Sequence, residues 1–371
     1  MKPAASVSRP RRLRWGAALL LLSATTGRAG SLLETMDQEV AALYQKSRDA
    51  IVKVHAQRAV TADNWPLAPI HRVGTGFFVD GAGHLLTSAT VVSDATACWI
   101  DWRGDRVPAR LLGRDPLTNV ALLQVDPEKC VGPGHPTPFL ACGNSDDLKV
   151  GSMIIAIGFP YDLPSSPSVG FVNGIDIKCG THTFITSHVR AGCRLQPGQG
   201  GGPMLNARGE VVGLAVAAHL EDQCYVLPIN AARKVAADIL EQGAPQYGWV
   251  GLSVTERAPG ALTTTTAQWE VFVQEIYSNT PAATAGFRER DLLLAIQTNE
   301  IHRAADVLNT MFHCRRGDRL CITVLRDGQR QQIRLVVGQR PAEETDAAPR
   351  LVLPPAAPRP PTIAPVAAPA P

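Results

Sequence analysis

The chain has 371 residues, of which 45% are hydrophobic, 19% charged and 5% aromatic. This composition is globular, and it excludes a wholly disordered chain or a fibrous repeat. At roughly 100–200 residues per domain, the length predicts two domains with extensions. The 32 glycines and 29 prolines favour many short strands and turns over a helical bundle.

The formal net charge of +3 is set by the N-terminus. Residues 1–29 contain six basic residues and no acidic one: Lys2, Arg9, Arg11, Arg12, Arg14 and Arg28. Without these six charges the remainder carries a net charge of −3. Because no long block of like charge follows, the sequence does not predict a nucleic-acid partner.

The first 29 residues have the layout of a secretory signal peptide. Basic residues at 9–14 precede an uncharged, mostly apolar run from Gly16 to Thr26, and the small residues Gly27 and Ala29 offer a cleavage site. We therefore expect a periplasmic or secreted protein, with an uncleaved membrane anchor as the alternative.

Eight cysteines fit an oxidising compartment. They are Cys98, Cys130, Cys142, Cys179, Cys193, Cys224, Cys314 and Cys321. The spacing does not choose among their pairings, and some are expected to be small buried residues.

The first half predicts a helix and then a series of short strands. Apolar residues at helical spacing predict a helix over 34–50, and 51–54 follows as a strand. Strands at 73–79 and 84–87 flank the turn residues 80–83 and predict a hairpin. Further strands are expected at 109–112, 121–125, 153–157, 171–177, 183–190 and 211–217, and a helix at 231–240. This pattern favours a β-barrel or β-sandwich.

Residues 244–248 predict a linker between two domains. Beyond it we expect strands at 249–254, 271–276, 292–296, 320–325 and 331–337, and helices at 281–285 and 304–312. Asp327-Gly328 predicts a tight hairpin turn, and Ser278 or Asn279 is the expected cap of the first helix. Residues 341–371 contain 10 prolines and 9 alanines and predict a disordered tail from residue 340, with a spacer or interaction arm as the alternative.

Several motifs occur in a specific order. They are Gly-Thr-Gly-Phe-Phe-Val at 74–79, Asp-Pro-Leu-Thr-Asn at 115–119, Gly-Asn-Ser at 143–145, Pro-Gly-Gln-Gly-Gly-Gly-Pro at 197–203 and Tyr-Val-Leu-Pro-Ile-Asn at 225–230. This set resembles the HtrA/Deg family of secreted trypsin-like serine proteases with C-terminal PDZ domains. The resemblance implies a mostly β protein: a chymotrypsin-like double β-barrel at 34–243 and an α+β PDZ domain at 246–339.

The resemblance also locates the catalytic positions, and all three are substituted. Thr90 stands where the family has His, Asn119 where it has Asp, and Gly200 where it has the nucleophilic Ser. Without these side chains the triad mechanism has no nucleophile and no base. Gly198 and Gly200 remain at the oxyanion-hole positions, whose backbone N–H groups need no particular side chain; the alternative is that the loop glycines serve only the turn.

Other reactive residues offer weaker alternatives. His188 and Cys193 suggest a Cys/His pair, but a disulfide or buried thiol is the favoured reading of Cys193. Cys179, His182, His188 and Cys193 have the residue types of a zinc site, yet along a strand His182 and His188 lie about 20 Å apart. We therefore expect no metal and no cofactor.

The second half is expected to bind peptides as PDZ domains do, by adding a strand to a sheet edge. The resemblance assigns Trp249, Val250, Gly251 and Leu252 to the carboxylate-binding loop and first groove strand. Val307, Leu308 and Met311 on the helix at 304–312 are candidates for the opposite wall; the alternative makes them core residues.

These expectations combine into one functional hypothesis. The sequence predicts a pseudoprotease that binds peptide C-termini or unfolded segments, as an adaptor, a chaperone-like holder or a regulator in protein quality control. Family resemblance adds an active HtrA-type relative as a partner and a homotrimer as an oligomeric state. The alternative is a serine-type endopeptidase that retains activity through a relocated nucleophile or base.

Overall fold

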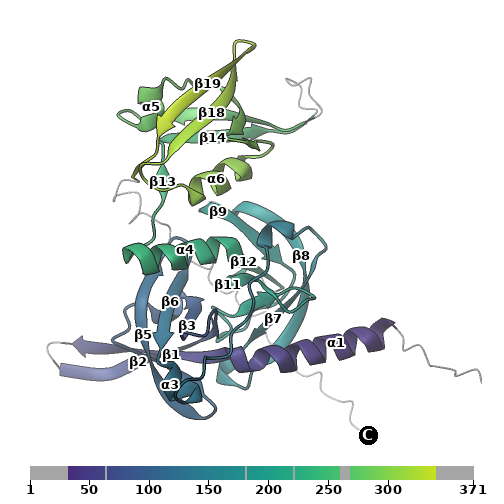
Figure 1. The fold of residues 1–371 in the computed structure, drawn as a ribbon, viewed down its shortest axis with the longest axis vertical. Coiled ribbons are helices and arrows are strands. Elements are labelled where there is room, and N and C mark those ends of the chain that lie inside the picture. The colour runs from purple at the N-terminus through teal and green to yellow at the C-terminus, as the bar shows by residue number, and fades with distance from the viewer. Residues whose placement is uncertain (1–31, 63–64, 180–181, 220–221, 260–267, 340–371) are drawn as a thin grey trace, which may run out of the picture. The chain divides into compact units, whose positions relative to one another are not determined.

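The computed structural model describes residues 32–62, 65–179, 182–219, 222–259 and 268–339 (Figure 1). The predicted signal peptide and the Pro/Ala-rich tail lie outside these residues. The chain divides into two units, residues 1–39 and 40–371. Within the described ranges, no helix has the length and apolar character needed to cross a membrane.

The first closed barrel has the strand order β1-β2-β3-β6-β5-β4. Its strands are β1 (Ile51–Ala62), β2 (Trp65–Phe78), β3 (His84–Ser88), β4 (Ala97–Trp102), β5 (Asp105–Asp115) and β6 (Val120–Val125). The helical segments in this part of the sequence are α1 (Leu32–Ser47), η1 (Arg48–Ala50), α2 (Ala89–Val92) and α3 (Pro127–Val131). The predicted hairpin is confirmed, because β2 and β3 pair antiparallel with Phe77 opposite Leu86.

The second closed barrel has the order β10-β11-β12-β9-β8-β7. Its strands are β7 (Met153–Gly158), β8 (Ser166–Cys179), β9 (His182–Ala191), β10 (Pro203–Leu205), β11 (Val211–His219) and β12 (Gln223–Pro228). The 3₁₀ turns η2 (Ser145–Asp147) and η3 (Pro160–Asp162) precede β7 and β8, and α4 (Ile229–Gln242) follows β12. The double β-barrel is therefore confirmed, although β4, β10 and β12 are strands that the sequence pattern missed.

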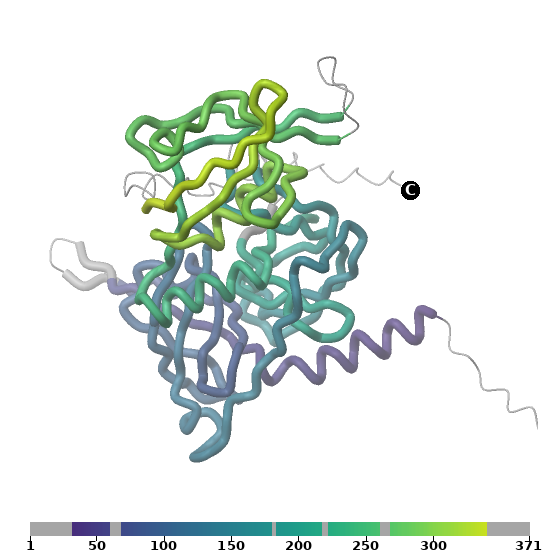
Figure 2. The backbone as a smooth tube through the Cα atoms, turned by 45° about the horizontal axis from the view of Figure 1, so that its top comes forward, coloured from purple at the N-terminus to yellow at the C-terminus, as the bar shows by residue number. Residues whose placement is uncertain are grey.

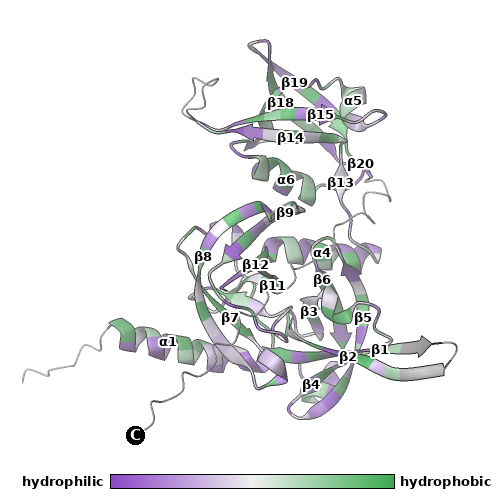
Figure 3. Ribbon diagram, turned by 180° about the vertical axis from the view of Figure 1, so that it is seen from behind, coloured by the Kyte–Doolittle hydropathy of each residue, from purple (hydrophilic) through white to green (hydrophobic). Residues whose placement is uncertain are grey.

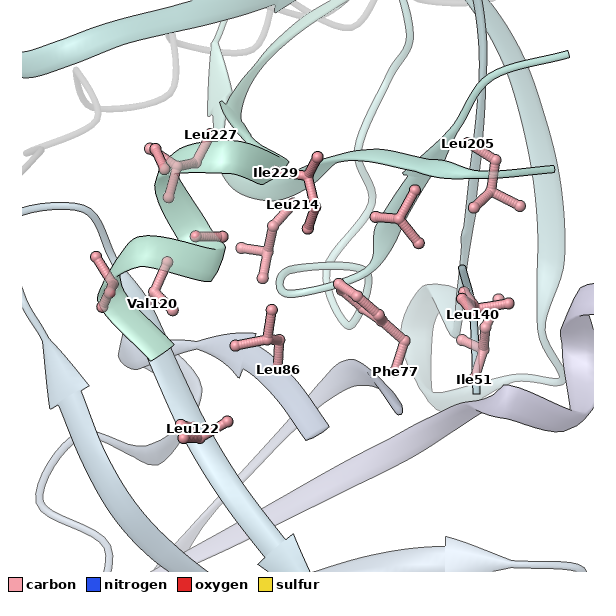
Figure 4. Close-up of a cluster of buried hydrophobic side chains, with 14 of the residues drawn as sticks. Ile51, Phe77, Leu86, Val120, Leu122, Leu140, Leu205, Leu214, Leu227 and Ile229 are labelled. Carbon is pink, nitrogen blue, oxygen red and sulfur yellow. The ribbon is translucent and has the colours of Figure 1, made fainter. Parts of the chain in front are cut away.

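The two barrels share one hydrophobic core (Figure 4). Phe77 and Leu86 from the first barrel and Leu214 and Leu227 from the second are at most 1% exposed and belong to the same cluster. Ile229 at the start of α4 lies in this cluster as well. Burying such side chains contributes about 1.5–3 kcal/mol each, so the core fixes the loops between the barrels.

The C-terminal domain begins at residue 248 and follows the barrels along the chain (Figure 2). Its main sheet has the order β14-β15-β16-β18-β19, with β17 paired to β16, and β13 pairs with β20. The strands are β13 (Gly248–Trp249), β14 (Leu252–Arg257), β15 (Glu270–Ile276), β16 (Leu292–Ile296), β17 (Asn299–Glu300), β18 (Arg319–Arg326), β19 (Gln329–Val336) and β20 (Gly338–Gln339). The helices are α5 (Pro281–Ala285) and the largely hydrophobic α6 (Ala304–His313) (Figure 3).

Two local predictions in this domain are wrong. The strand expected at 249–254 is broken between β13 and β14, because Gly251 takes a φ of 76°, outside the extended region. The cap of α5 is Thr280, whose hydroxyl accepts a hydrogen bond from the Ala283 N–H at 3.2 Å. Asn279, one of the two expected caps, lies one residue earlier with a φ of 61°.

The predicted hairpin at Asp327-Gly328 is confirmed, with φ of 52° and 77° at its two turn residues.

Candidate functional site

A buried carboxylate holds the loop that carries Asn119. Asp115 is 2% exposed, and its oxygens accept hydrogen bonds from the Leu117 N–H at 3.1 Å and the Thr118 N–H at 3.0 Å. The hydroxyls of Thr118 and Tyr247 also donate to it. Burial and the nearby Asp115 charge raise the pKa of Tyr247, so its phenol stays protonated and donates. The linker residue Tyr247 thus helps to set the conformation of this loop.

Asn119 itself adopts a left-handed conformation with a φ of 57°. Asn tolerates this region better than most residues. Its backbone carbonyl accepts a hydrogen bond from the Ala89 N–H at 3.0 Å. The loop therefore presents the Asn119 side chain to the first turn of α2, which contains Thr90.

Every polar atom of the Asn119 side chain has a partner. Its Oδ1 accepts from the Ser88 hydroxyl at 2.9 Å and from the Thr90 N–H and hydroxyl at 2.8 Å each. Its Nδ2 donates to the Val216 carbonyl at 2.7 Å. The structure therefore brings Thr90 and Asn119 together, as the resemblance implied.

This arrangement has no proton acceptor that works near neutral pH. The amide of Asn119 carries no charge, and the Thr90 hydroxyl donates its proton to it rather than taking one. Within the described ranges, no histidine ring forms a hydrogen bond with Thr90 or Asn119. A hydroxyl held by a neutral amide lacks the adjacent base that activates a nucleophile.

The loop from Gly198 to Gly202 keeps a specific backbone path. Gly198 and Gly201 have φ of 95° and 86°, and a Cβ at either position would overlap a backbone oxygen, of Phe159 and of Thr75 respectively. Gly200 differs from both, since its φ is not positive and a Cβ there would meet nothing within 4 Å. The fold therefore needs glycine at 198 and 201, whereas it accommodates a side chain at position 200.

Two carbonyl hydrogen bonds orient the N–H groups of this loop. The Pro197 carbonyl accepts from the Tyr161 N–H at 2.6 Å, and the Gln199 carbonyl accepts from the Gly202 N–H at 3.0 Å. In a trans peptide the N–H of the next residue points opposite to the carbonyl. The N–H groups of Gly198 and Gly200 are therefore directed away from these partners.

The structure gives Cys193 a different partner from the one considered in the Cys/His alternative. Its Sγ lies 3.4 Å from Cys224 Sγ. The Nδ1 of His188 lies 3.0 Å from the Thr186 carbonyl, and its ring stacks on Phe184. Among the described residues, no group of three or more His, Cys, Asp and Glu side chains has the geometry to hold a metal ion.

The loop before β14 is oriented by its carbonyls in the same manner. The Val250 carbonyl accepts from the Ala282 N–H at 2.8 Å, and the Gly251 carbonyl accepts from the Tyr277 N–H at 3.0 Å. Because peptides are trans, the N–H groups of Gly251 and Leu252 point away from α5 and β15. Trp249 pairs with Gly338 between β13 and β20.

The groove-forming candidates on α6 separate into two kinds. Val307 is 5% exposed and belongs to the domain core. Leu308 and Met311 are only partly buried, and Met311 packs at the edge of the same cluster. Val250 is likewise a core residue, whereas Leu252 is partly buried. Of the three helix residues for which a core role is the alternative, only Val307 lies in the core, and Val250 of the loop lies there as well.

Sequence reasoning missed the contact between β14 and the start of α6. The guanidinium of Arg303 donates to both carboxylate oxygens of Glu256 at 3.1 and 2.9 Å, and the Ala304 N–H donates to the same carboxylate at 3.0 Å. Arg303 also lies 3.9 Å from the Trp269 ring centroid. β14 is an edge strand of the sheet, and this ion pair ties its far end to α6.

Comparison with known families agrees with this two-part architecture. Residues 74–214 match the trypsin-like peptidase domain, and residues 248–337 match the PDZ domain. The chain is 28% identical over 293 residues to a probable periplasmic serine endoprotease DegP-like of Pseudomonas fluorescens, covering 74% of this chain and 58% of that relative. It is 27% identical over 338 residues to the putative serine protease HhoB of Synechocystis, covering 81% and 79%. The chain thus spans little more than half of the DegP-like relatives.

Solved structures show the same fold. The HtrA-type protease AlgW with a tripeptide superposes with a TM-score of 0.65 and 24% identity, covering 81% of this chain and 97% of AlgW. A serine endoprotease from Yersinia pestis gives 0.55 and 21%, covering 81% and 98%. In domain content, domain order and sequence similarity, the chain resembles the HtrA/DegP-like proteases, with a trypsin-like peptidase domain followed by a PDZ domain.

Proposed function

We propose that this protein is an HtrA-like pseudoprotease that binds the C-termini of peptides or of unfolded proteins through its PDZ domain. The observation that carries the proposal is that both polar atoms of the Asn119 side chain are hydrogen-bonded within the protein. The Thr90 hydroxyl is one of the donors to this neutral amide. A triad needs a nucleophile beside a base that a third group orients. Here Gly200 supplies no nucleophile and the Thr90 position supplies no base.

The PDZ domain supports the binding half of the proposal. β14 lies at the edge of its sheet, and an edge strand accepts an added peptide strand through main-chain hydrogen bonds. The Gly251 and Leu252 N–H groups, directed away from α5 and β15, are the donors for a terminal carboxylate. Leu308 and Met311 are the candidates for contact with the last side chains of the peptide.

The similarity to the relatives supports a proposed location and proposed partners for this protein. The similarity to periplasmic DegP-like proteins and the signal-like N-terminus favour export, and the PDZ domain favours a role as adaptor, holder or regulator of an active HtrA-type protease. Homo-oligomerisation, as a trimer, is part of the same proposal.

A peptide-library measurement tests this proposal. A random library with free C-termini and the same library with amidated C-termini are offered to the full chain. A carboxylate held by backbone N–H groups makes strong charge-assisted bonds, so we expect amidation to weaken binding at least about tenfold. Equal recovery of both libraries would contradict C-terminal recognition.

The competing proposal is an endopeptidase with a relocated nucleophile. It needs a Ser, Cys or Thr with a base within hydrogen-bond reach in the cleft. Cleavage of unfolded casein by the native chain, followed by mass spectrometry, distinguishes the two. Reproducible cuts that copurify with the folded protein would favour the enzyme, whereas intact casein favours the pseudoprotease.

A further inference from the structure

Two buried cysteines meet between β9 and β12. Cys193 is 5% exposed and Cys224 is fully buried, and their sulfurs lie 3.4 Å apart. β9 and β12 pair antiparallel, with Cys224 opposite Ala191, so Cys193 lies just beyond the paired end of β9. Both thiols belong to the hydrophobic cluster of the second barrel. The pair therefore lies in a fixed place within the folded domain.

The two sulfurs lie in non-bonded contact, at a distance longer than that of a bond. A disulfide has an S–S length of about 2.05 Å, so small rotations of the two side chains would close the gap. We propose that Cys193 and Cys224 form an intrachain disulfide that ties the approach to the former nucleophile loop to β12. This inference does not depend on whether the protein cleaves peptides.

The chemistry is thiol–disulfide exchange with an external disulfide as the oxidant. The Cys193 thiolate attacks one sulfur of that disulfide and releases a thiolate, which leaves a mixed disulfide. The Cys224 thiolate then attacks the Cys193 sulfur and releases the second thiolate. The two cysteine protons pass to solvent or to the released thiolates. In sum, two protein thiols are oxidised and one external disulfide is reduced to two thiols.

The surroundings favour Cys193 as the attacking group. A hydrogen bond from Cys224 lowers the pKa of Cys193, and the same contact together with burial raises the pKa of Cys224. Because both sulfurs are buried in the folded domain, the oxidant reaches Cys193 during folding or during local opening of the β9 end.

The cross-link would hold in place one wall of a cavity in the second barrel. Gly192, Cys193, Arg194, Gln196 and Gln199 contribute to the lining of a cavity of about 420 Å³. The chain runs from Cys193 directly through this wall to Gly198 and Gly200. A bond from Cys193 to β12 therefore fixes the first residue of the segment that leads to the loop from Gly198 to Gly202.

Peptide mapping of the full chain tests the proposal. The purified protein is unfolded and refolded with oxidised glutathione, and a second sample is kept in dithiothreitol; both are alkylated under denaturing conditions. We expect one linked pair of peptides, containing Cys193 and Cys224, in the oxidised sample alone. Alkylation of both cysteines after oxidation, or linkage of either to another cysteine, would overturn the proposal.

Variants give a second readout. The linked pair of peptides should disappear in Cys193→Ser and in Cys224→Ser. It should persist in the matched control Cys142→Ser, since Cys142 lies elsewhere, in an isolated β-bridge with Val211. Reduction should lower the melting temperature of the native chain and of Cys142→Ser by roughly 5–10 °C. An equal melting temperature with and without the cross-link would contradict a structural role. The mapping of the native chain stands by itself if a serine variant fails to fold.

Discussion

The Asn119 region of the first barrel and the Gly251 loop of the PDZ domain are held in place by different groups. At Asn119, side-chain atoms make the contacts, and all of them are used within the protein. At Gly251, backbone carbonyls make the contacts, and they leave the opposite N–H groups directed outward. Backbone recognition survives a change of side chains, whereas acid–base chemistry requires particular ones. Under the proposed function, one chain can therefore lack triad catalysis and still bind peptides.

The largest effect is expected from Gly251→Ala. A Cβ at this left-handed position would overlap the Thr280 side chain, so the loop must move. We expect a loss of roughly 2–4 kcal/mol of stability and at least tenfold weaker peptide binding, measured by denaturation and by titration with a library-selected peptide. The matched control is Gly328→Ala, because Gly328 is also left-handed, with a φ of 77°, but a Cβ there would meet no atom within 4 Å. Equal losses of peptide binding in both variants would show that the Gly251 loop has no special part in binding.

A smaller loss is expected from Asn119→Asp alone. The carboxylate would face the Val216 carbonyl, where the amide now donates at 2.7 Å. Leaving these oxygens without a donor costs about 1–3 kcal/mol. Urea denaturation should show this loss, with peptide binding unchanged. Adding Thr90→His supplies a donor to the carboxylate, and the account predicts partial recovery of stability in the double variant.

The ion pair at the far end of β14 predicts a modest pH dependence. The hydrogen bond from Arg303 lowers the pKa of Glu256 below its ordinary value of 4.5. A lowered carboxyl pKa stabilises the fold above the unfolded value, and this contribution is lost as pH falls through the lower folded value. Solvent reaches both side chains in part, with Arg303 48% and Glu256 24% exposed, so the screened pair contributes about 0.2–1 kcal/mol.

The stability difference between the native chain and Glu256→Gln measures this contribution. It should be present at neutral pH and shrink below about pH 4. A difference that stays constant down to strongly acidic pH would show that the ion pair is not its source. A difference that grows as pH falls would have the wrong sign for a lowered pKa.

The smallest effect is expected from Gly200→Ser. The position has open space and a φ that is not positive, so stability should change by no more than about 0.5 kcal/mol. Gly201→Ser is the contrast, because its Cβ would overlap the Thr75 carbonyl oxygen. If both variants were equally destabilised, the loop would not have the path described above.

The sequence predicted the parts of the fold that follow from local pattern. Alternating and continuous apolar runs located most strands, and α5 and β16 have the bounds expected. The pattern missed β12, where Tyr225-Val226-Leu227-Pro228 was recognised only as part of a motif. It also missed the break at Gly251, since that depends on packing against Thr280.

The features of the candidate site that the sequence did not predict are contacts between segments far apart in the chain. Tyr247 and Asp115 are 132 residues apart, and Cys193 and Cys224 meet only because β9 and β12 are neighbours. The family resemblance placed Thr90, Asn119 and Gly200 in one region, but the hydrogen bonds of the Asn119 side chain come from β3, α2 and β11. No spacing in the sequence encodes such contacts.

The most direct test restores the triad. Unfolded casein is incubated with the native chain and with the variant Thr90→His, Asn119→Asp, Gly200→Ser, and the products are mapped by mass spectrometry. We expect intact casein with the native chain, and cuts with the triple variant that a serine-hydrolase inhibitor abolishes. Reproducible cuts by the native chain, retained through repurification, would contradict the claim that catalysis has been lost.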